Sequence, residues 1–132
     1  ERTASDAIRA AMQAPALDLV GKDTLKQLPA LLARAELVMT PDSGPMHIAN
    51  AMGTRVLGLH AASNPLRSGP YSDVRYCVDR YDAAARKFLG KPASELRWGT
   101  KIEFDDVMQL ISVDDAVAAF ERYVQDTSQP AL

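Results

Sequence analysis

The segment TPDSGPMH, at residues 40–47, places an acid, a hydroxyl, a glycine, prolines and a histidine between two apolar stretches. The apolar run before it predicts a strand, whose carboxyl end would lie at the edge where open α/β sheets bind ligands. Pro45 suits the first position of a helix, because its φ is preset and its missing N–H is not needed there. Gly44 lets a ligand approach the main chain closely. The amides of the following helical turn, at the positive end of the helix dipole, are therefore predicted to bind a phosphate group.

The side chains of this segment suggest separate roles. Ser43 supplies a hydroxyl donor, whereas ionised Asp42 only accepts hydrogen bonds and would suit a sugar hydroxyl better than a phosphate. The alternative is a plain strand-to-helix turn in which Asp42 or Ser43 caps the helix and Gly44 serves only the geometry. We interpret His47 as a structural hydrogen-bonding residue rather than a catalyst. No second His, Cys or acid lies at metal-ligand spacing from it, so no metal and no cofactor is assigned.

Two further loops are expected at the same edge of the sheet. The loop at 61–74 contains NPLRSGPY, in which Arg67 is a fork-shaped donor able to bind an anion. The backbone of the turn VGKDT, at 20–24, would border a flat ring such as adenine. Simpler interpretations stay open, with Arg67 as a solvated arginine and with Asp23 and Thr24 as ordinary helix-start residues.

The elements that position these loops alternate between strand and helix. Short apolar runs predict strands, and the leucines of TLKQLPALLARA predict a helix in which Pro29 favours a start near Lys26 or a slight kink. The predicted order is a strand at 16–21, a helix at 24–35, a strand at 36–40, a helix at 45–53 and a strand at 54–60. This alternation, with strands apolar on both faces, indicates a Rossmann-like, doubly wound parallel sheet in the α/β class.

The second half of the chain is less regular. The expected elements are a strand at 74–78, a short helix ended by Gly90, a helical turn at 92–96 and an irregular stretch at 99–111, with a strand at its start as an alternative. The C-terminal helix, at residues 112–126, has clear signals in its Ser112 cap and in Asp115 three residues later. The apolar residues on one face of this helix are Val117, Phe120 and Val124. The residues interpreted as merely structural or exposed are Cys77, Trp98, Asp105 and Asp106.

Composition predicts one soluble globular domain over residues 1–132, with 47% hydrophobic residues. Fifteen basic and 17 acidic residues leave a net charge of −2, so no basic surface for nucleic acid is expected. The single cysteine fits a reducing compartment, and no apolar run approaches the roughly 20 residues of a membrane span. The helical pattern ERTASDAIRAAM begins at the first residue without a methionine. We therefore expect a domain that is incomplete, N-terminally truncated, with preceding strands and helices outside this sequence.

The run LVGKDTLKQLPALLARAELVMTPDSGPMHIANAMGTRVLGLH, followed by SNPLRSGPY, resembles the C-terminal half of family 9 glycosyltransferases. These are the heptosyltransferases that extend the inner core of lipopolysaccharide. The similarity runs from about residue 15 to residue 71, and the combination D-S-G-P-M-H plus G-P-Y is fairly specific. Residues 79–111 match less well. The resemblance implies a GT-B enzyme with two Rossmann-like domains, of which the C-terminal one binds the nucleotide-sugar donor, typically ADP-heptose.

The same resemblance implies roles for individual residues. The diphosphate would be held by Asp42, Ser43, Gly44 and Pro45 and by the amides of Met46 and His47. Asp42 would also contact the transferred sugar, and the adenine would be bordered by Gly21, Lys22 and Asp23. Further candidates are Thr40, Arg67 and, for the ribose, Glu1. The general base and the lysine-bearing phosphate loop of the family would lie upstream, so no catalytic residue is assigned within 1–132.

These expectations describe the donor-binding part of an inverting, metal-independent glycosyltransferase that transfers heptose, or a related sugar, from an ADP-sugar to lipopolysaccharide core. Residues 1–132 alone are expected to be inactive. The expected partners are the donor, an N-terminal acceptor-binding domain and a lipid-linked saccharide acceptor, for a cytoplasmic enzyme at the inner face of the bacterial inner membrane. The alternatives are a non-catalytic nucleotide-binding module, a nucleotide-sugar epimerase-like domain, and an interaction surface formed by residues 75–132.

Overall fold

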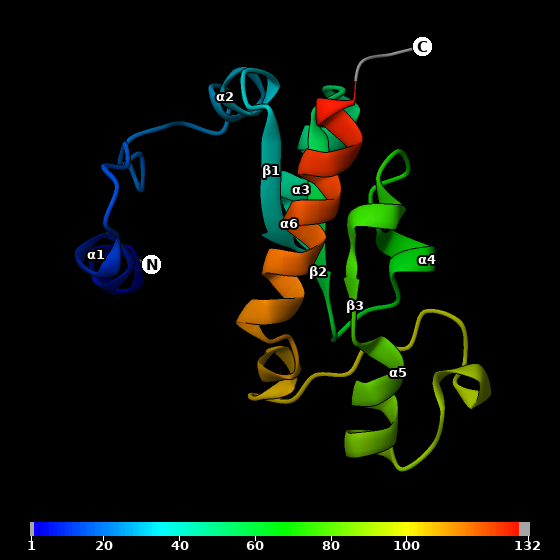
Figure 1. Cartoon of the computed structure of the whole chain (residues 1–132). Coiled ribbons are helices and arrows are strands. Elements are labelled where there is room, and N and C mark those ends of the chain that lie inside the picture. The colour runs from blue at the N-terminus through cyan, green and yellow to red at the C-terminus, as the bar shows by residue number, and fades with distance from the viewer. Residues whose placement is uncertain (1, 130–132) are drawn as a thin grey trace.

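A computed structural model of the chain describes residues 2–129 and shows an α/β protein built on a small parallel sheet (Figure 1). The first half contains α1 (Arg2–Ala11), α2 (Leu28–Ala33), β1 (Leu37–Pro41), α3 (Gly44–Ala51) and β2 (Arg55–His60). The second half contains α4 (Pro65–Ser68), β3 (Val78–Asp79), α5 (Tyr81–Ala84) and α6 (Val113–Ser128). Glu1 lies outside the described residues, so its predicted contact with a ribose has no counterpart here.

The three strands are parallel in the order β1-β2-β3, which confirms the parallel sheet expected from the alternation of elements. Helices cover both faces of this sheet. On one face, Val56 packs with Met46 and Ala49 of α3. On the other face, Leu57 packs with Ala119 of α6. Neighbouring residues of β2 thus point to opposite faces, and both faces are apolar because both are covered.

The predicted strand at 16–21 was wrong. No strand forms there, and a local turn occupies the second half of the segment. The Asp18 carboxylate accepts the N–H of Val20 at 3.0 Å, and the N–H of Lys22 donates to the Leu19 carbonyl at 3.0 Å. Such short-range hydrogen bonds compete with a sheet ladder. Leu17 is 85% exposed, so the apolar run has no covering layer to favour a strand.

The predicted helix at 24–35 is shorter than expected, because it begins only at Leu28. Pro29 lies in its first turn, where a missing N–H is tolerated, which agrees with the late start that this proline favours. The residues before it form a turn in which the N–H of Gln27 donates to the Thr24 carbonyl at 2.9 Å. This short α2 still packs on the sheet unit, since Leu32 lies against the cluster around α3.

The predicted strand at 74–78 is mostly a 3-10 turn, and only Val78–Asp79 pairs with β2. The turn forms because the Asp73 carbonyl accepts the N–H of Tyr76 at 2.8 Å. The buried Asp73 carboxylate accepts Arg55 at 2.9 Å and the N–H of Val56 at 3.0 Å. One loop carboxylate therefore holds the beginning of β2.

The stretch from 81 to 111 contains the short helices that its sequence predicts. The helix beginning with α5 continues as a wider turn to Leu89 and ends at Gly90, whose φ of +71° is the left-handed conformation that glycine favours at a helix end. A 3-10 turn at Ala93–Glu95 and another at Val107–Leu110 follow. No strand forms in the stretch 99–111, so the alternative of a strand at its start was wrong.

The α6 helix begins with the predicted cap. Ser112 Oγ accepts the N–H of Asp115 at 3.1 Å, and the Asp115 carboxylate accepts the N–H of Ser112 at 3.0 Å. Arg80 also donates to Asp115, and these contacts lower the pKa of that carboxyl to about 2. The face that carries Val117 and Phe120 is only half covered, whereas Ala119 is buried against the sheet.

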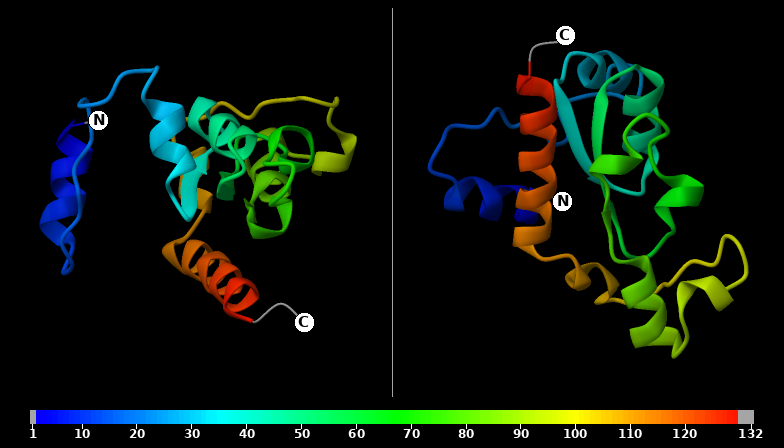
Figure 2. Two further views of the ribbon diagram at one scale, coloured as in Figure 1. Left: turned by 90° about the horizontal axis from the view of Figure 1, so that it is seen from above. Right: turned by 45° about the vertical axis from the view of Figure 1, so that its right-hand side comes forward.

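Figure 2 shows the N-terminal helix α1 set off from the sheet at the end of a long connection. No residue of α1 is buried, and Ile8 is 62% exposed. The helix is held mainly by polar contacts, in which Arg2 and Arg9 approach the Asp18 carboxylate. The core of the molecule therefore lies in residues 36–119, around the sheet.

Candidate functional site at the carboxyl edge of the sheet

The segment TPDSGPMH joins the end of β1 to the beginning of α3, as its sequence predicts. Ser43 is the extended residue before the helix, and Gly44 and Pro45 form its first turn. The Met46 side chain is fully buried under the sheet and holds the helix start in place. The backbone of Ser43 and Gly44 therefore lies directly after the carboxyl end of β1, at the ligand-binding edge of such sheets.

Neither Asp42 nor Ser43 caps this helix through its side chain, so the alternative of a side-chain-capped turn was wrong. The Ser43 hydroxyl lies 3.1 Å from the Thr40 hydroxyl and 3.2 Å from the Pro41 carbonyl, back toward the strand. The Asp42 carboxylate is engaged by a different loop. The N-terminus of α3 is consequently left without the side-chain acceptor that usually satisfies its amides.

The amides of this first turn differ in availability. Pro45 has no N–H, and the N–H of Met46 donates to the Ser43 carbonyl at 3.1 Å. Gly44 is exposed, and its N–H has no hydrogen-bond partner within residues 2–129. A Cβ added at Gly44 would meet no atom within 4 Å, so the space beside this residue is open. Gly44 thus offers a free amide to a ligand, whereas the Met46 amide would first have to leave Ser43.

Asp42 joins two loops. One of its carboxylate oxygens accepts the Ser63 hydroxyl at 2.6 Å and the Ser68 hydroxyl at 2.6 Å. The other oxygen lies 3.3 Å from Nε2 of His47. The loop at 61–74 therefore meets the segment 40–47, as expected for loops that follow neighbouring strands. Ser63 and Ser68 were missed from the sequence because single serines in a loop give no pattern that distinguishes them.

The hydrogen bonds to Asp42 decide its charge. Burial alone would raise the pKa of this carboxyl, but the Ser63 and Ser68 hydroxyls favour the ionised form and hold the pKa below its ordinary value. The carboxylate is therefore an anion at neutral pH that only accepts hydrogen bonds. Of its roughly four acceptor positions, two take serine hydroxyls and one faces His47. One position is left for a ligand.

His60 extends this network into the core. Its Nδ1 lies 3.3 Å from the Ser63 hydroxyl, which itself donates to Asp42. Ser63 can therefore only accept a hydrogen bond from His60, so Nδ1 must be the protonated ring nitrogen. Burial lowers the pKa of His60, so the ring is neutral at neutral pH. Nε2 then has a buried lone pair with no hydrogen-bond partner in the described chain. A Cβ at Gly58 would lie 2.8 Å from this nitrogen, so the close approach requires glycine.

The Arg67 side chain does not lie against residues 40–47. Its guanidinium packs on Gly99, where an added Cβ would lie 3.0 Å from Nε. The Arg67 side chain makes no hydrogen bond and no ion pair with residues 40–47. The structure thus brings the loop at 61–74 to the candidate site through its serines rather than through its arginine.

The turn at Gly21, Lys22 and Asp23 does not follow a strand. Lys22 Nζ donates to the Asp18 carbonyl at 2.9 Å, so this lysine bends back along its own segment. The neighbouring residues Leu19 and Val20 line the same open cavity of about 710 Å³ as Thr40. The turn therefore lies near the first loop, but its own residues do not line that cavity.

A smaller cavity of about 160 Å³ adjoins Asp42 at the end of the sheet. The polar residues that line it are Asp42, Ser63, Lys101 and Glu103. Over residues 2–129 there is no cluster of His, Cys, Asp and Glu able to hold a metal ion, and no helix among them has the length and apolarity to cross a membrane. Burial raises the pKa of the Cys77 thiol to about 11, which agrees with a structural role.

Comparisons with known proteins identify the family of the chain. The chain is 44% identical over 105 residues to the lipopolysaccharide core heptosyltransferase OpsX of Haemophilus influenzae, a match that covers 80% of this chain and 30% of that protein. The chain thus corresponds to less than a third of this relative's length. No solved structure matches the chain significantly. The family model described as glycosyltransferase family 9 (heptosyltransferase) matches residues 1–99. The chain belongs to glycosyltransferase family 9.

Proposed function

We propose that this chain is the donor-binding part of an inverting, metal-independent glycosyltransferase that transfers heptose, or a related sugar, from an ADP-sugar to lipopolysaccharide core. The observation that carries the proposal is the uncapped start of α3, directly after the carboxyl end of β1 in a family 9 chain. An uncapped helix start presents donors and a positive dipole end, both of which favour a phosphate group.

The diphosphate would lie against Gly44. Its amide is free and the space beside it is open, so an anion can approach the main chain closely. The Ser43 hydroxyl and the Met46 amide would contribute once their present hydrogen bonds rearrange, together with the amide of His47. The expectation that the backbone at Gly21, Lys22 and Asp23 borders the adenine remains a prediction, and so does the role of Thr40.

The transferred sugar would lie on the Asp42 side of the phosphates. Asp42 is ionised, accepts hydrogen bonds only and keeps one acceptor position open, so it suits a hydroxyl of the sugar. It is a poor general base, because its lowered pKa makes it a weak proton acceptor at neutral pH. This agrees with a base supplied by another part of the full-length protein.

In this scheme the base deprotonates an acceptor hydroxyl, which attacks the anomeric carbon of the donor and expels the nucleoside diphosphate. The amides at the start of α3 would stabilise the charge that develops on the leaving diphosphate, the task that a metal ion performs in many other phosphate chemistries. The remaining partners we propose are an N-terminal acceptor-binding domain and a lipid-linked saccharide acceptor at the inner face of the inner membrane.

The test uses the full-length protein, purified in the presence of EDTA, with ADP-heptose and a core oligosaccharide acceptor. We expect transfer with inversion at the anomeric carbon, detected by NMR of the product, and a rate that EDTA does not reduce. Donor binding without transfer to any core acceptor would favour a nucleotide-binding module. Interconversion of the bound nucleotide sugar without an acceptor would favour an epimerase.

Gly44→Val tests the phosphate position directly. A Cβ added at Gly44 meets nothing within 4 Å outside its own helical turn, so the variant should fold while its branched side chain obstructs the ligand. We expect ADP affinity to fall roughly 10-fold or more, as for the loss of one charge-assisted hydrogen bond. Ala51→Val, at the exposed far end of the same helix, is the matched control and should bind ADP normally.

A further inference from the structure

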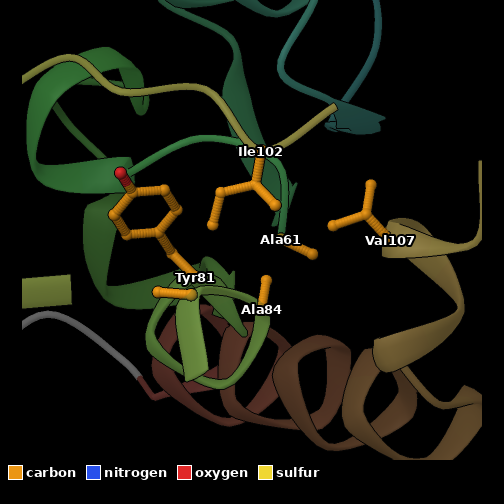
Figure 3. Packing of buried hydrophobic residues seen from close by; sticks show 6 residues of the cluster. Ala61, Tyr81, Ala84, Ile102 and Val107 are labelled. Carbon is orange, nitrogen blue, oxygen red and sulfur yellow. The ribbon is translucent and has the colours of Figure 1, made fainter. Parts of the chain in front are cut away.

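The segment that contains Lys101 and Glu103 is held firmly over the end of β2. Ile102 between them is fully buried against Ala61 and Tyr81, as Figure 3 shows. The N–H of Ile102 donates to the Ala62 carbonyl at 2.9 Å, and the Tyr81 hydroxyl donates to the Thr100 carbonyl at 2.8 Å. The backbone on this side of the cavity therefore has a defined position.

Lys101 and Glu103 flank the buried isoleucine and both line the cavity of about 160 Å³ beside Asp42. Both side chains are exposed, and neither forms a hydrogen bond or an ion pair with any residue from 2 to 129. Two charged side chains without an ion-pair partner among residues 2–129 therefore line the same cavity as Asp42 and Ser63, on a backbone segment with a defined position.

The lining of this cavity indicates the chemistry of its ligand. Two carboxylates, from Asp42 and Glu103, face one ammonium from Lys101, and this balance disfavours a phosphate. The two carboxylates as acceptors and a three-donor ammonium together suit a polyol, which both donates and accepts hydrogen bonds. Leu59 and Met108 add apolar surface that can cover the C–H groups of a sugar ring.

The size of the cavity limits what enters it. Sites for whole ligands usually measure about 300–1,000 Å³. A cavity of about 160 Å³ holds one part of a larger ligand. Because Asp42 lines this cavity and precedes Gly44 by only two residues, a nucleotide sugar with its phosphates at Gly44 would place its sugar here.

We infer that Lys101 and Glu103 bind hydroxyl groups of the transferred sugar and select it among nucleotide sugars. The inference rests on the proposed function, and it deepens that function by adding two residues beyond the 1–99 range that the family model matches. In this assignment Lys101 donates to the sugar hydroxyls and Glu103 accepts from them, across the ring from Asp42.

The experiment measures binding of ADP and of ADP-heptose by calorimetry, on the full-length protein. The variants are Lys101→Met and Glu103→Gln, and the matched controls are Lys91→Met and Glu95→Gln, which replace exposed residues of the same types outside the cavity. For Lys101→Met and Glu103→Gln we expect unchanged ADP affinity and roughly 10-fold weaker binding of ADP-heptose, equal to one lost hydrogen bond to a charged group. The controls should bind both ligands as the unsubstituted protein does.

The outcomes separate this inference from the function on which it rests. If the unsubstituted protein binds neither ADP nor ADP-heptose, both are overturned. If it binds ADP-heptose and the cavity variants match their controls, the proposed function stands and the role of Lys101 and Glu103 is overturned. Equal weakening of ADP and ADP-heptose would also overturn it, because the two residues would then act on the nucleotide.

Discussion

The segments 36–60 and 2–27 both carry apolar residues at regular spacing, yet only the first is packed. Val56 and Leu57 of β2 are fully buried, whereas Leu17 is 85% exposed and no residue of α1 is buried. In 36–60, each strand has a neighbour and a helix on each face. In 2–27, the helix and the following apolar run have neither, and polar contacts to Asp18 take their place.

The surroundings of an apolar run decide whether it becomes a strand. An apolar run forms a strand when it has an edge to pair with and layers to cover it, since most of the stability of an element comes from packing. The loop after β1 has a defined position because the strand precedes it and the buried Met46 side chain follows it. The turn at 20–24 is not positioned in this way, because no strand precedes it.

The largest expected effect is on stability. Leu57→Ala removes a fully buried side chain from between the sheet and α6, and should lower the free energy of unfolding by about 2–5 kcal/mol. Leu17→Ala should change it by no more than about 0.5 kcal/mol, because that side chain is already exposed. Urea unfolding followed by circular dichroism measures both. Equal losses would show that segment 2–27 is packed as firmly as the sheet.

A second, smaller effect on stability concerns the buried carboxylate of Asp73, which binds the beginning of β2. Asp73→Asn removes the charge that accepts Arg55 and turns an amide donor toward it, which should cost about 1–3 kcal/mol. The exposed Asp105→Asn is the control and should leave unfolding unchanged. An Asp73→Asn protein as stable as its control would mean that the buried pair does not hold the beginning of β2.

A third effect is the pH dependence due to His60. Burial lowers the pKa of this ring in the folded chain below its ordinary 6.5, so below about pH 6.5 the unfolded chain binds the proton more readily. Stability should therefore fall as the pH drops from 6.5 toward the lowered pKa. His60→Gln should flatten this slope, and His47→Gln, at the exposed histidine, should retain it. Unfolding curves between pH 5 and 7, compared as slopes, measure the difference, and identical slopes in all three proteins would contradict it.

Local signals made part of the fold predictable. Pro45 and Gly44 indicate a helix start by backbone geometry alone, and Ser112 with Asp115 does the same for α6; both starts are confirmed. The runs that became β1 and β2 were visible because each is short, apolar and bounded by turn residues. The run at 16–21 has the same short, apolar pattern. Whether it forms a strand depends on a neighbouring strand and a covering layer, which sequence periodicity does not reveal.

The contacts of the site were beyond prediction for a similar reason. Ser63 and Ser68 reach Asp42 from 21 and 26 residues away along the chain, and only the fold brings those hydroxyls to one oxygen. Lys101 and Glu103 lie further still, on a stretch with no regular secondary structure. The family was recognisable from the sequence, because its motifs are local, and the chemistry expected at residues 40–47 stays a prediction.

One binding measurement compares the loop at 40–47 with the turn at 20–24. Binding of ADP-heptose to the full-length protein is measured by calorimetry for Asp42→Asn and Asp23→Asn, with thermal unfolding to confirm that each variant is folded. We expect Asp42→Asn to weaken binding roughly 10-fold or more, because it removes the charged acceptor for the sugar. Asp23→Asn should have little effect, since only the backbone of its turn is expected beside the adenine. Unchanged binding in a folded Asp42→Asn protein would mean that the donor does not bind at the carboxyl edge of β1.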